Sequence, residues 1–264
     1  MTTATLPRPI RGASPLRAAG LFIGRSLTHS LRDIDALILA IVLPVMLMLL
    51  FTFVFGGAIA GDHQAYMAYI TPGTILLCAG YGAATTAVSV NRDLNTGTIN
   101  RLRTMPIAAA TVLAGHVVAS LLRNLLATAV VIAVSLGLGY RTPAGLGGWL
   151  GAFAVVALWI LAITALFAAL GLIAGSPESA SGFGFILLFL PYVSSSFVPV
   201  DTLPTWLQGF ALHQPITPVG ETIRSLLAGN GFGAWTPWAL AWSLGITLIA
   251  AIAVAVLFGR RVPR

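Results

Sequence analysis

The sequence contains no lysine, a single cysteine and few charged residues of either sign. Only 8% of its 264 residues are charged, against roughly 25% in soluble domains. A nucleotide-binding P-loop needs a lysine beside the β- and γ-phosphates, so this chain alone cannot be an ATPase of that class. The single Cys78 lies in an apolar run, so no disulfide can form within the chain and we expect a buried thiol.

Long apolar runs make up most of the sequence. Hydrophobic residues account for 58% of the chain, and the runs reach the length of about 20 residues that an α-helix needs to cross a bilayer. Barrel strands would show alternating segments of about 10 residues. We therefore predict an all-α integral membrane protein with six transmembrane helices, at about 36–60, 68–90, within 111–139, and at about 147–174, 179–199 and 235–258.

The 14 arginines are distributed unevenly around these predicted helices, and cytoplasmic segments of membrane proteins carry an excess of basic residues. The N-in/C-in orientation places most of them inside: Arg8, Arg11, Arg17, Arg25, Arg32, Arg92, Arg101, Arg103, Arg260, Arg261 and Arg264. Arg141 and Arg224 then lie outside. If the absence of lysine reflects a GC-rich genome, the membrane is a bacterial cytoplasmic membrane. The arginines cluster at span ends, which argues against nucleic acid as a partner.

The first 35 residues are predicted to form a cytoplasmic N-terminal arm, followed by a transmembrane domain over 36–264. Within 16–35, one side of a helix is apolar and the opposite side carries Arg17, Arg25 and Arg32. Such a helix lies in the headgroup plane, with its arginines toward anionic lipid and water. The alternative is an ordinary surface helix on a soluble domain, for which the sequence shows no candidate.

Carboxylates are confined to predicted loops and span ends: Asp33, Asp35, Asp62, Asp93, Glu178, Asp201 and Glu221. Proton-coupled transporters need ionisable groups within the membrane. An ion-coupled secondary transporter remains an alternative, because sodium coupling can use carbonyls and hydroxyls. A membrane enzyme is a further alternative. However, the histidines and acids show no metal-ligand spacing, and no serine lies in a nucleophile elbow, so we predict no catalytic and no metal site.

Arg123 is the only charged residue within a predicted apolar run. It could mark a substrate site or a contact between helices. We expect instead that the third span crosses the membrane only from about Asn124 to Tyr140, so that Arg123 extends to the interface.

Residues 200–230 are too apolar for a free loop but contain only short helices, broken at Gln214–Pro215. The second is expected to begin with Thr217 at its N-cap and Pro218 at its first position. A helical hairpin that dips into the outer leaflet and packs on the spans is the natural interpretation.

The segment 91–107, NRDLNTGTINRLRTMPI, is polar and lies between two apolar runs. Gly97 interrupts the preceding helix, Thr98 can cap a new one, and Pro106 ends it. Ile99, Leu102 and Met105 recur every three residues and form one apolar stripe. The segment is either a docking helix for another subunit or an ordinary basic loop. A docking helix would allow another subunit to supply energy to a chain that lacks both an ATPase motif and a proton relay.

This segment resembles the hallmark of permease subunits of ATP-binding-cassette exporters of the second exporter class, in the daunorubicin-resistance-like branch. The similar positions are Asp93, Gly97, Arg101, Arg103, Pro106 and Ile107. The resemblance continues through 112–126, with His116 in place of a frequent arginine, and through 190–229, with Gln214 in place of the usual asparagine. There the matching positions are Phe197, Pro199, Leu203, Pro204, Trp206, Leu207, Pro215, Ile216 and Thr217.

The resemblance implies the partners and roles of these segments. A coupling helix would extend over Gly97–Pro106, with Asp93 just before it, and would bind in a groove of a separate ATPase. Its contact residues would be Thr98, Ile99, Arg101, Leu102, Arg103 and Met105. The helix at 16–35 would be the interfacial connecting helix, and Leu203, Pro204, Trp206, Leu207, Pro215 and Thr217 would belong to an outer gate hairpin. Two permease chains, identical or homologous, would pair over two ATPase chains. ATP and magnesium would bind to those ATPases and no cofactor to this chain.

By the same resemblance, the substrate would move along the interface between permeases, lined mainly by the second and fifth spans. The fifth span offers uncharged aromatic and hydroxyl side chains: Phe185, Phe189, Tyr192, Ser194, Ser195, Ser196 and Phe197. This lining is typical of a site for a hydrophobic or amphipathic compound, such as a drug, an antibiotic or a lipid.

Overall fold

The computed structural model describes residues 34–96 and 109–260, together with Gly24. All regular elements in this part of the chain are helical. The long α-helices are α2 (Ile34–Leu50), α4 (His63–Asn95), α6 (Ala109–Gly137), α7 (Leu146–Ile173) and α11 (Thr236–Arg260). The shorter elements are a π-helical turn (Phe51–Phe55), α3 (Gly56–Ala60), α8 (Pro177–Phe189), two 3-10 turns (Leu190–Val193 and Val200–Thr202), α9 (Thr205–His213) and α10 (Ile216–Leu227).

Side-chain caps mark where two of these helices begin. The Asp62 carboxylate accepts hydrogen bonds from the backbone N–H groups of Gln64 (3.3 Å) and Ala65 (3.0 Å), which would otherwise have no partner at the start of α4. Gly61 adopts a φ of 70° in the tight turn before it, a conformation that favours glycine. Ser176 and Ser179 form a reciprocal capping box at the start of α8, with Pro177 at its first position.

Five stretches in the described residues are long and apolar enough to cross a membrane: Ala40–Ile59, His63–Asn95, Leu113–Gly137, Leu146–Ile173 and Thr236–Leu257. They correspond to five of the six predicted spans. The helix predicted over 179–199 is different, because α8 has only 13 residues and ends at Phe189. A 3-10 turn containing Pro191 follows, and Ser194 is fully extended. Proline has no backbone N–H to continue the helix, so the chain leaves the α-helical path there.

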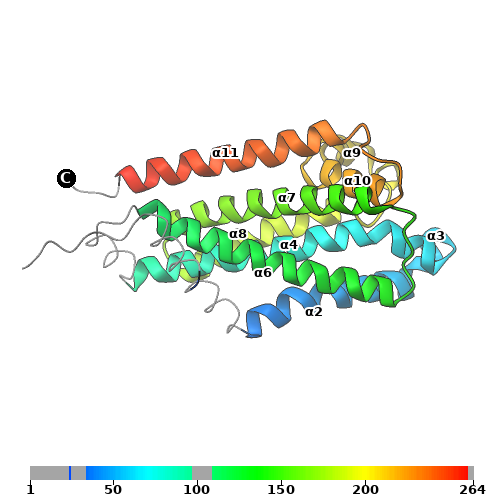
Figure 1. The fold of residues 1–264 in the computed structure, drawn as a ribbon, viewed down its shortest axis with the longest axis horizontal. Coiled ribbons are helices and arrows are strands. Elements are labelled where there is room, and N and C mark those ends of the chain that lie inside the picture. Colours follow the sequence, from blue (N-terminus) through cyan, green and yellow to red (C-terminus); the bar gives the residue numbers. More distant parts are fainter. Residues whose placement is uncertain (1–23, 25–33, 97–108, 261–264) are drawn as a thin grey trace, which may run out of the picture.

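The helices lie side by side and alternate in direction (Figure 1). The turn between α3 and α4, the connection between α6 and α7 and the α9–α10 hairpin gather at one end of the bundle. The ends of α4, α7 and α11 and the start of α6 lie at the other end. α4 is the central element, because it packs against α2, α6, α7, α8 and α10, whereas α11 packs mainly on α7 and α10.

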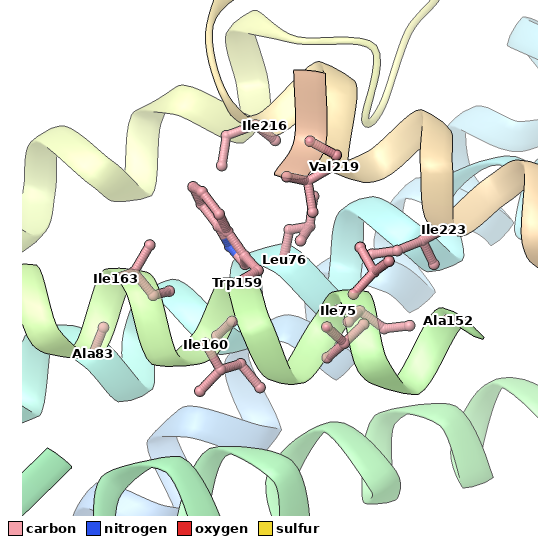
Figure 2. Packing of buried hydrophobic residues seen from close by; sticks show 14 of the residues in the cluster. Ile75, Leu76, Ala83, Ala152, Trp159, Ile160, Ile163, Ile216, Val219 and Ile223 are labelled. Atoms are coloured by element: carbon pink, nitrogen blue, oxygen red, sulfur yellow. The ribbon is translucent and has the colours of Figure 1, made fainter. Parts of the chain in front are cut away.

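A large apolar cluster joins α4, α7 and α10. Trp159 of α7 is only 1% exposed and points toward Ile216 and Val219 of α10 (Figure 2). Ile75 and Leu76 of α4 complete this part of the cluster. The predicted packing of the 200–230 hairpin on the long helices is thus confirmed for α10. α9 is largely exposed, and its main contacts are with α10 and the 3-10 turn before it.

The predicted start of the second hairpin helix is wrong. The break at Gln214–Pro215 is present, but α10 begins at Ile216, so Thr217 and Pro218 lie inside its first turn. The Gln214 side chain accepts the hydrogen bond from the Ile216 backbone N–H at 3.0 Å. Gln214 therefore takes the capping function assigned to Thr217, and the Thr217 hydroxyl is free for a tertiary contact.

Candidate functional site

The predicted coupling residues Gly97, Thr98, Ile99, Arg101, Leu102, Arg103, Met105 and Pro106 lie outside the described residues, and so does most of the predicted interfacial helix. Asp93 is described, in the last turn of α4. Its Oδ2 lies 3.0 Å from Nε2 of His116 on α6. This pair joins the two helix ends between which residues 97–108 run.

A second contact fixes the same end of α4 to α7. The Asn91 side-chain amide is buried and donates hydrogen bonds to the carbonyl oxygens of Gly171 (3.2 Å) and Ala174 (2.7 Å). These carbonyls lie at the C-terminal end of α7, where they have no partner within the helix. A displacement of this end of α4 would therefore be transmitted directly to α6 and α7.

Near the middle of the bundle, a groove of about 470 Å³ lies between α2, α4 and α8. It is mostly apolar and is lined by Ala40, Leu43, Tyr81, Ala84, Thr85, Val88, Ser181, Gly184, Phe185 and Leu188. Of the predicted path residues, only Phe185 lies in this lining. Tyr81 and Thr85 were not predicted as lining residues from the sequence, but the small residues around them in CAGYGAATTA are typical of close helix packing.

The other predicted path residues separate into two groups. Phe185 and Phe189 are 63% and 65% exposed on one side of α8. Ser194, Ser195, Ser196 and Phe197 are buried in the segment that follows. The Ser194 hydroxyl donates to the Pro191 carbonyl at 2.6 Å and accepts from the Ser196 backbone N–H at 3.0 Å. In this single chain these serines hold a turn together, and the partly buried Tyr192 stacks on Phe197 beside them.

Arg123 is buried, so our expectation that it extends to the membrane interface is wrong. Its side chain is on α6, and the residue is only 4% exposed. The guanidinium donates hydrogen bonds to the Gly82 carbonyl (3.1 Å), the Thr85 hydroxyl (2.6 Å) and the Ser120 hydroxyl (3.0 Å). The first two acceptors belong to α4. The alternative interpretation, a contact between helices, is the correct one, and Thr85 connects it to the wall of the groove.

Close packing at Gly82 explains how the Arg123 side chain reaches the α4 backbone. A Cβ atom at Gly82 would lie 1.4 Å from Oδ1 of Asn124, so only glycine fits there. The Thr86 and Ser120 hydroxyls also form a hydrogen bond across this contact. A buried charge needs several hydrogen-bond partners to offset its loss of hydration. The α4–α6 interface provides them through two hydroxyls and one carbonyl.

At the other end of the bundle, α10 holds the segment that follows α8. The Gln214 amide donates to the carbonyl oxygen of Val193 at 3.2 Å. The Thr217 hydroxyl donates to the Ala211 carbonyl (2.6 Å) and accepts from the Ser195 backbone N–H (3.1 Å). Of the remaining predicted gate residues, Pro204 and Trp206 are exposed, and Leu203, Leu207 and Pro215 are half-buried. The hairpin is therefore bound to the bundle through α10, with α9 on the outside.

Comparison with known proteins shows the family of this chain. The family model described as ABC-2 type transporter matches residues 18–228. The daunorubicin resistance ABC transporter permease protein DrrB1 of Streptomyces coeruleorubidus is 30% identical over 94% of this chain and 87% of its own length. The probable doxorubicin resistance ABC transporter permease protein DrrC of Mycobacterium tuberculosis is 27% identical over 96% and 94%. The inner membrane transport permease YadH of Escherichia coli is 29% identical over 66% and 69%. The chain belongs to the ABC-2 type transporter family, as a membrane-spanning subunit.

Proposed function

We propose that this chain is the permease subunit of an ATP-driven exporter that moves a hydrophobic or amphipathic compound out across a bacterial cytoplasmic membrane. The main support for this cargo is the apolar groove between α2, α4 and α8. Its few polar groups, Tyr81, Thr85 and Ser181, are uncharged, as a site for a hydrophobic compound requires. Relatives named for daunorubicin and doxorubicin resistance support an amphipathic drug as cargo.

The energy for transport comes from a partner ATPase in this proposal. The sequence has no lysine for a P-loop, and relatives named as ABC transporter permeases support a separate ATPase chain. Two permeases pair over two ATPases, which bind ATP and magnesium. Residues 97–106 receive the movement of the ATPase, and the contacts of Asp93 and Asn91 pass it to α6 and α7.

The membrane orientation is also part of the proposal. α8, with 13 residues, and the four-residue 3-10 turn after it complete a sixth crossing whose outer end is covered by the hairpin. α11 ends at the same end of the bundle as α4. The excess of arginine in the sequence segments that precede α2 and follow α4 and α11 supports a cytoplasmic location for both termini.

Transport should depend on ATP and not on the proton gradient. We expect inside-out vesicles that contain this chain and its ATPase to accumulate daunorubicin when ATP is supplied. Collapsing the proton gradient with a protonophore should change the rate by less than about twofold, because the part of the chain that the structure describes has no carboxylate chain across the bundle. Vesicles whose ATPase lacks its P-loop lysine are the control. Uptake that survives in this control and stops with the protonophore would indicate an ion-coupled transporter.

Filling the groove should reduce transport. A Ser181→Phe substitution places an aromatic ring in the groove lining, and we expect the rate of daunorubicin uptake to fall at least about fivefold. Gly182→Phe is the matched control, because a Cβ atom at this neighbouring position meets nothing within 4 Å and the residue does not line the groove. Equal rates for the two variants in the same vesicle assay would exclude this groove from the cargo path.

A further inference from the structure

Arg224 on α10 contacts two other elements at the hairpin end of the bundle. Its Nη2 donates hydrogen bonds to the carbonyl oxygen of Tyr69 on α4 (3.0 Å) and to that of Ser195 after α8 (2.9 Å). Its guanidinium carbon lies 4.1 Å from the centre of the Tyr69 ring, a cation–π contact. Glu221, one turn earlier on α10, pairs with Nη1. One side chain therefore connects α10, α4 and the segment after α8.

The geometry of these contacts favours a guanidinium over an ammonium group. A planar fork with several N–H donors can serve two carbonyls and a carboxylate at the same time, whereas the ammonium of lysine is a compact point charge. The arginine side chain is 19% exposed, so most of its hydration has been replaced by these partners. Hydrogen bonds to a charged group in such surroundings are strong, and their loss leaves the charge without compensation.

Three further contacts fix the same three elements in one arrangement. The Tyr66 hydroxyl of α4 donates to the Phe197 carbonyl at 2.8 Å. A Cβ atom at Gly73 would lie 2.5 Å from Cβ of Ser196 and 2.8 Å from its carbonyl oxygen, so α4 and this segment touch at the backbone. α10 joins them through Thr217, whose hydroxyl accepts from Ser195 N–H. Packing this close resists gradual deformation.

We infer that Arg224 is a positioning residue that clamps α10 to α4 and to residues 194–197, so that these three elements move as one unit during transport. This inference rests on the proposed function. The opposite mode, in which α10 swings away from α4 to open the exit, would separate the guanidinium from two carbonyls and from the Tyr69 ring. In the clamped mode, the exit opens at the border of this unit, and the tilt of α4 carries the hairpin with it.

A cross-link between α4 and α10 distinguishes the two modes. A Cβ atom at Gly220 would lie 3.5 Å from Cδ1 of Leu76, so cysteines at these two positions are close enough for a short, reducible bifunctional thiol reagent to join them. The buried Cys78 is replaced by alanine in this background. We expect the cross-linked protein to transport daunorubicin in the vesicle assay within about twofold of the reduced protein, because no relative movement is blocked. Loss of transport that reductant restores would overturn the clamp.

Substitution of the arginine gives a second test. We expect Arg224→Met to export about tenfold less daunorubicin per ATP hydrolysed, with normal assembly, and Arg224→Lys to recover part of this ratio. Arg141→Met is the matched control, because Arg141 lies at the same end of the bundle and donates hydrogen bonds to the nearby carbonyls of Leu136 and Tyr140 rather than to another helix. An unchanged ratio in Arg224→Met would exclude a positioning function. If Arg224→Met does not fold, the cross-linking experiment still tests whether α4 and α10 move together.

Failure of the proposed function would be visible separately. In that case the wild-type chain with its ATPase would not transport daunorubicin at all. The clamp would then be tested by spin labels on cysteines that replace the exposed Ala65 of α4 and Ala228 at the end of α10, with Cys78 replaced by alanine. A narrow distance distribution in the otherwise unchanged chain that broadens in Arg224→Met supports the clamp, and equally narrow distributions in both contradict it.

Discussion

Replacing Gly171 by alanine is expected to destabilise the bundle by about 3 kcal/mol or more. A Cβ atom at this position of α7 would lie 2.5 Å from the carbonyl oxygen of Ala87 and 3.0 Å from its Cα. Both atoms belong to the backbone of α4, which cannot move aside as a flexible side chain can. The added methyl group must therefore push α7 away from α4, at the contact where Asn91 donates to the Gly171 carbonyl.

The measurement is the thermal midpoint of the purified protein in detergent, followed by the loss of its monodisperse gel-filtration peak. Gly245→Ala in α11 is the matched control, because a Cβ atom there meets nothing within 4 Å. This control should be neutral or slightly stabilising, since alanine favours the helix over glycine. If the two variants unfold at the same temperature, the close approach of α4 and α7 is not correct.

Changing one charged and one apolar residue of the proposed coupling segment should abolish transport. In the double variant Arg101→Glu with Leu102→Ala, a basic side chain and one residue of the apolar stripe are both changed. We expect daunorubicin transport to fall to background, because truncation of a buried hydrophobic anchor together with one interfacial charge typically costs an interface about 2–5 kcal/mol. Co-purification with the ATPase should be lost, while the amount of protein in the membrane stays normal.

Arg260→Glu, at the end of α11, is the control for a general effect of charge on membrane insertion. Because it lies outside the proposed coupling segment, it should retain both transport and ATPase association. Wild-type association and transport in the double variant would show that residues 97–106 are not the docking helix.

The long helices could be predicted because their signal is local. A run of about 20 apolar residues has few alternatives in a bilayer, where every backbone polar group must be satisfied within the segment. The predicted range 147–174 differs from α7 (Leu146–Ile173) by one residue at each end. The prediction over 179–199 was less successful because composition alone does not reveal where a chain leaves the helical path. There Pro191 and the hydrogen bonds of Ser194 decided the local conformation.

The candidate sites could not be predicted from the sequence, because they depend on contacts between segments that are distant along the chain. Arg123 in isolation is a costly charge, and extension to the interface was the reasonable expectation. Its burial is possible only because Gly82 lets α4 approach Asn124, which brings the Thr85 hydroxyl and a backbone carbonyl within reach. Similarly, the sequence predicts that the serines at 194–196 line the substrate path. In the structure, the α10 side chains of Thr217 and Arg224 instead form hydrogen bonds with the backbone of Ser195.

Composition alone establishes that this chain is a helical membrane protein and that its 264 residues hold no lysine for a P-loop, because hydrophobic length and residue content can be read without the fold. The sequence also carried the motifs of the family. Which polar side chains face a groove and which hold helices together depends on how the helices pack, and could not be read from the sequence. A buried hydroxyl or guanidinium in a membrane protein must find a partner, and the identity of that partner depends on how closely two backbones approach, as at Gly82 and Gly73.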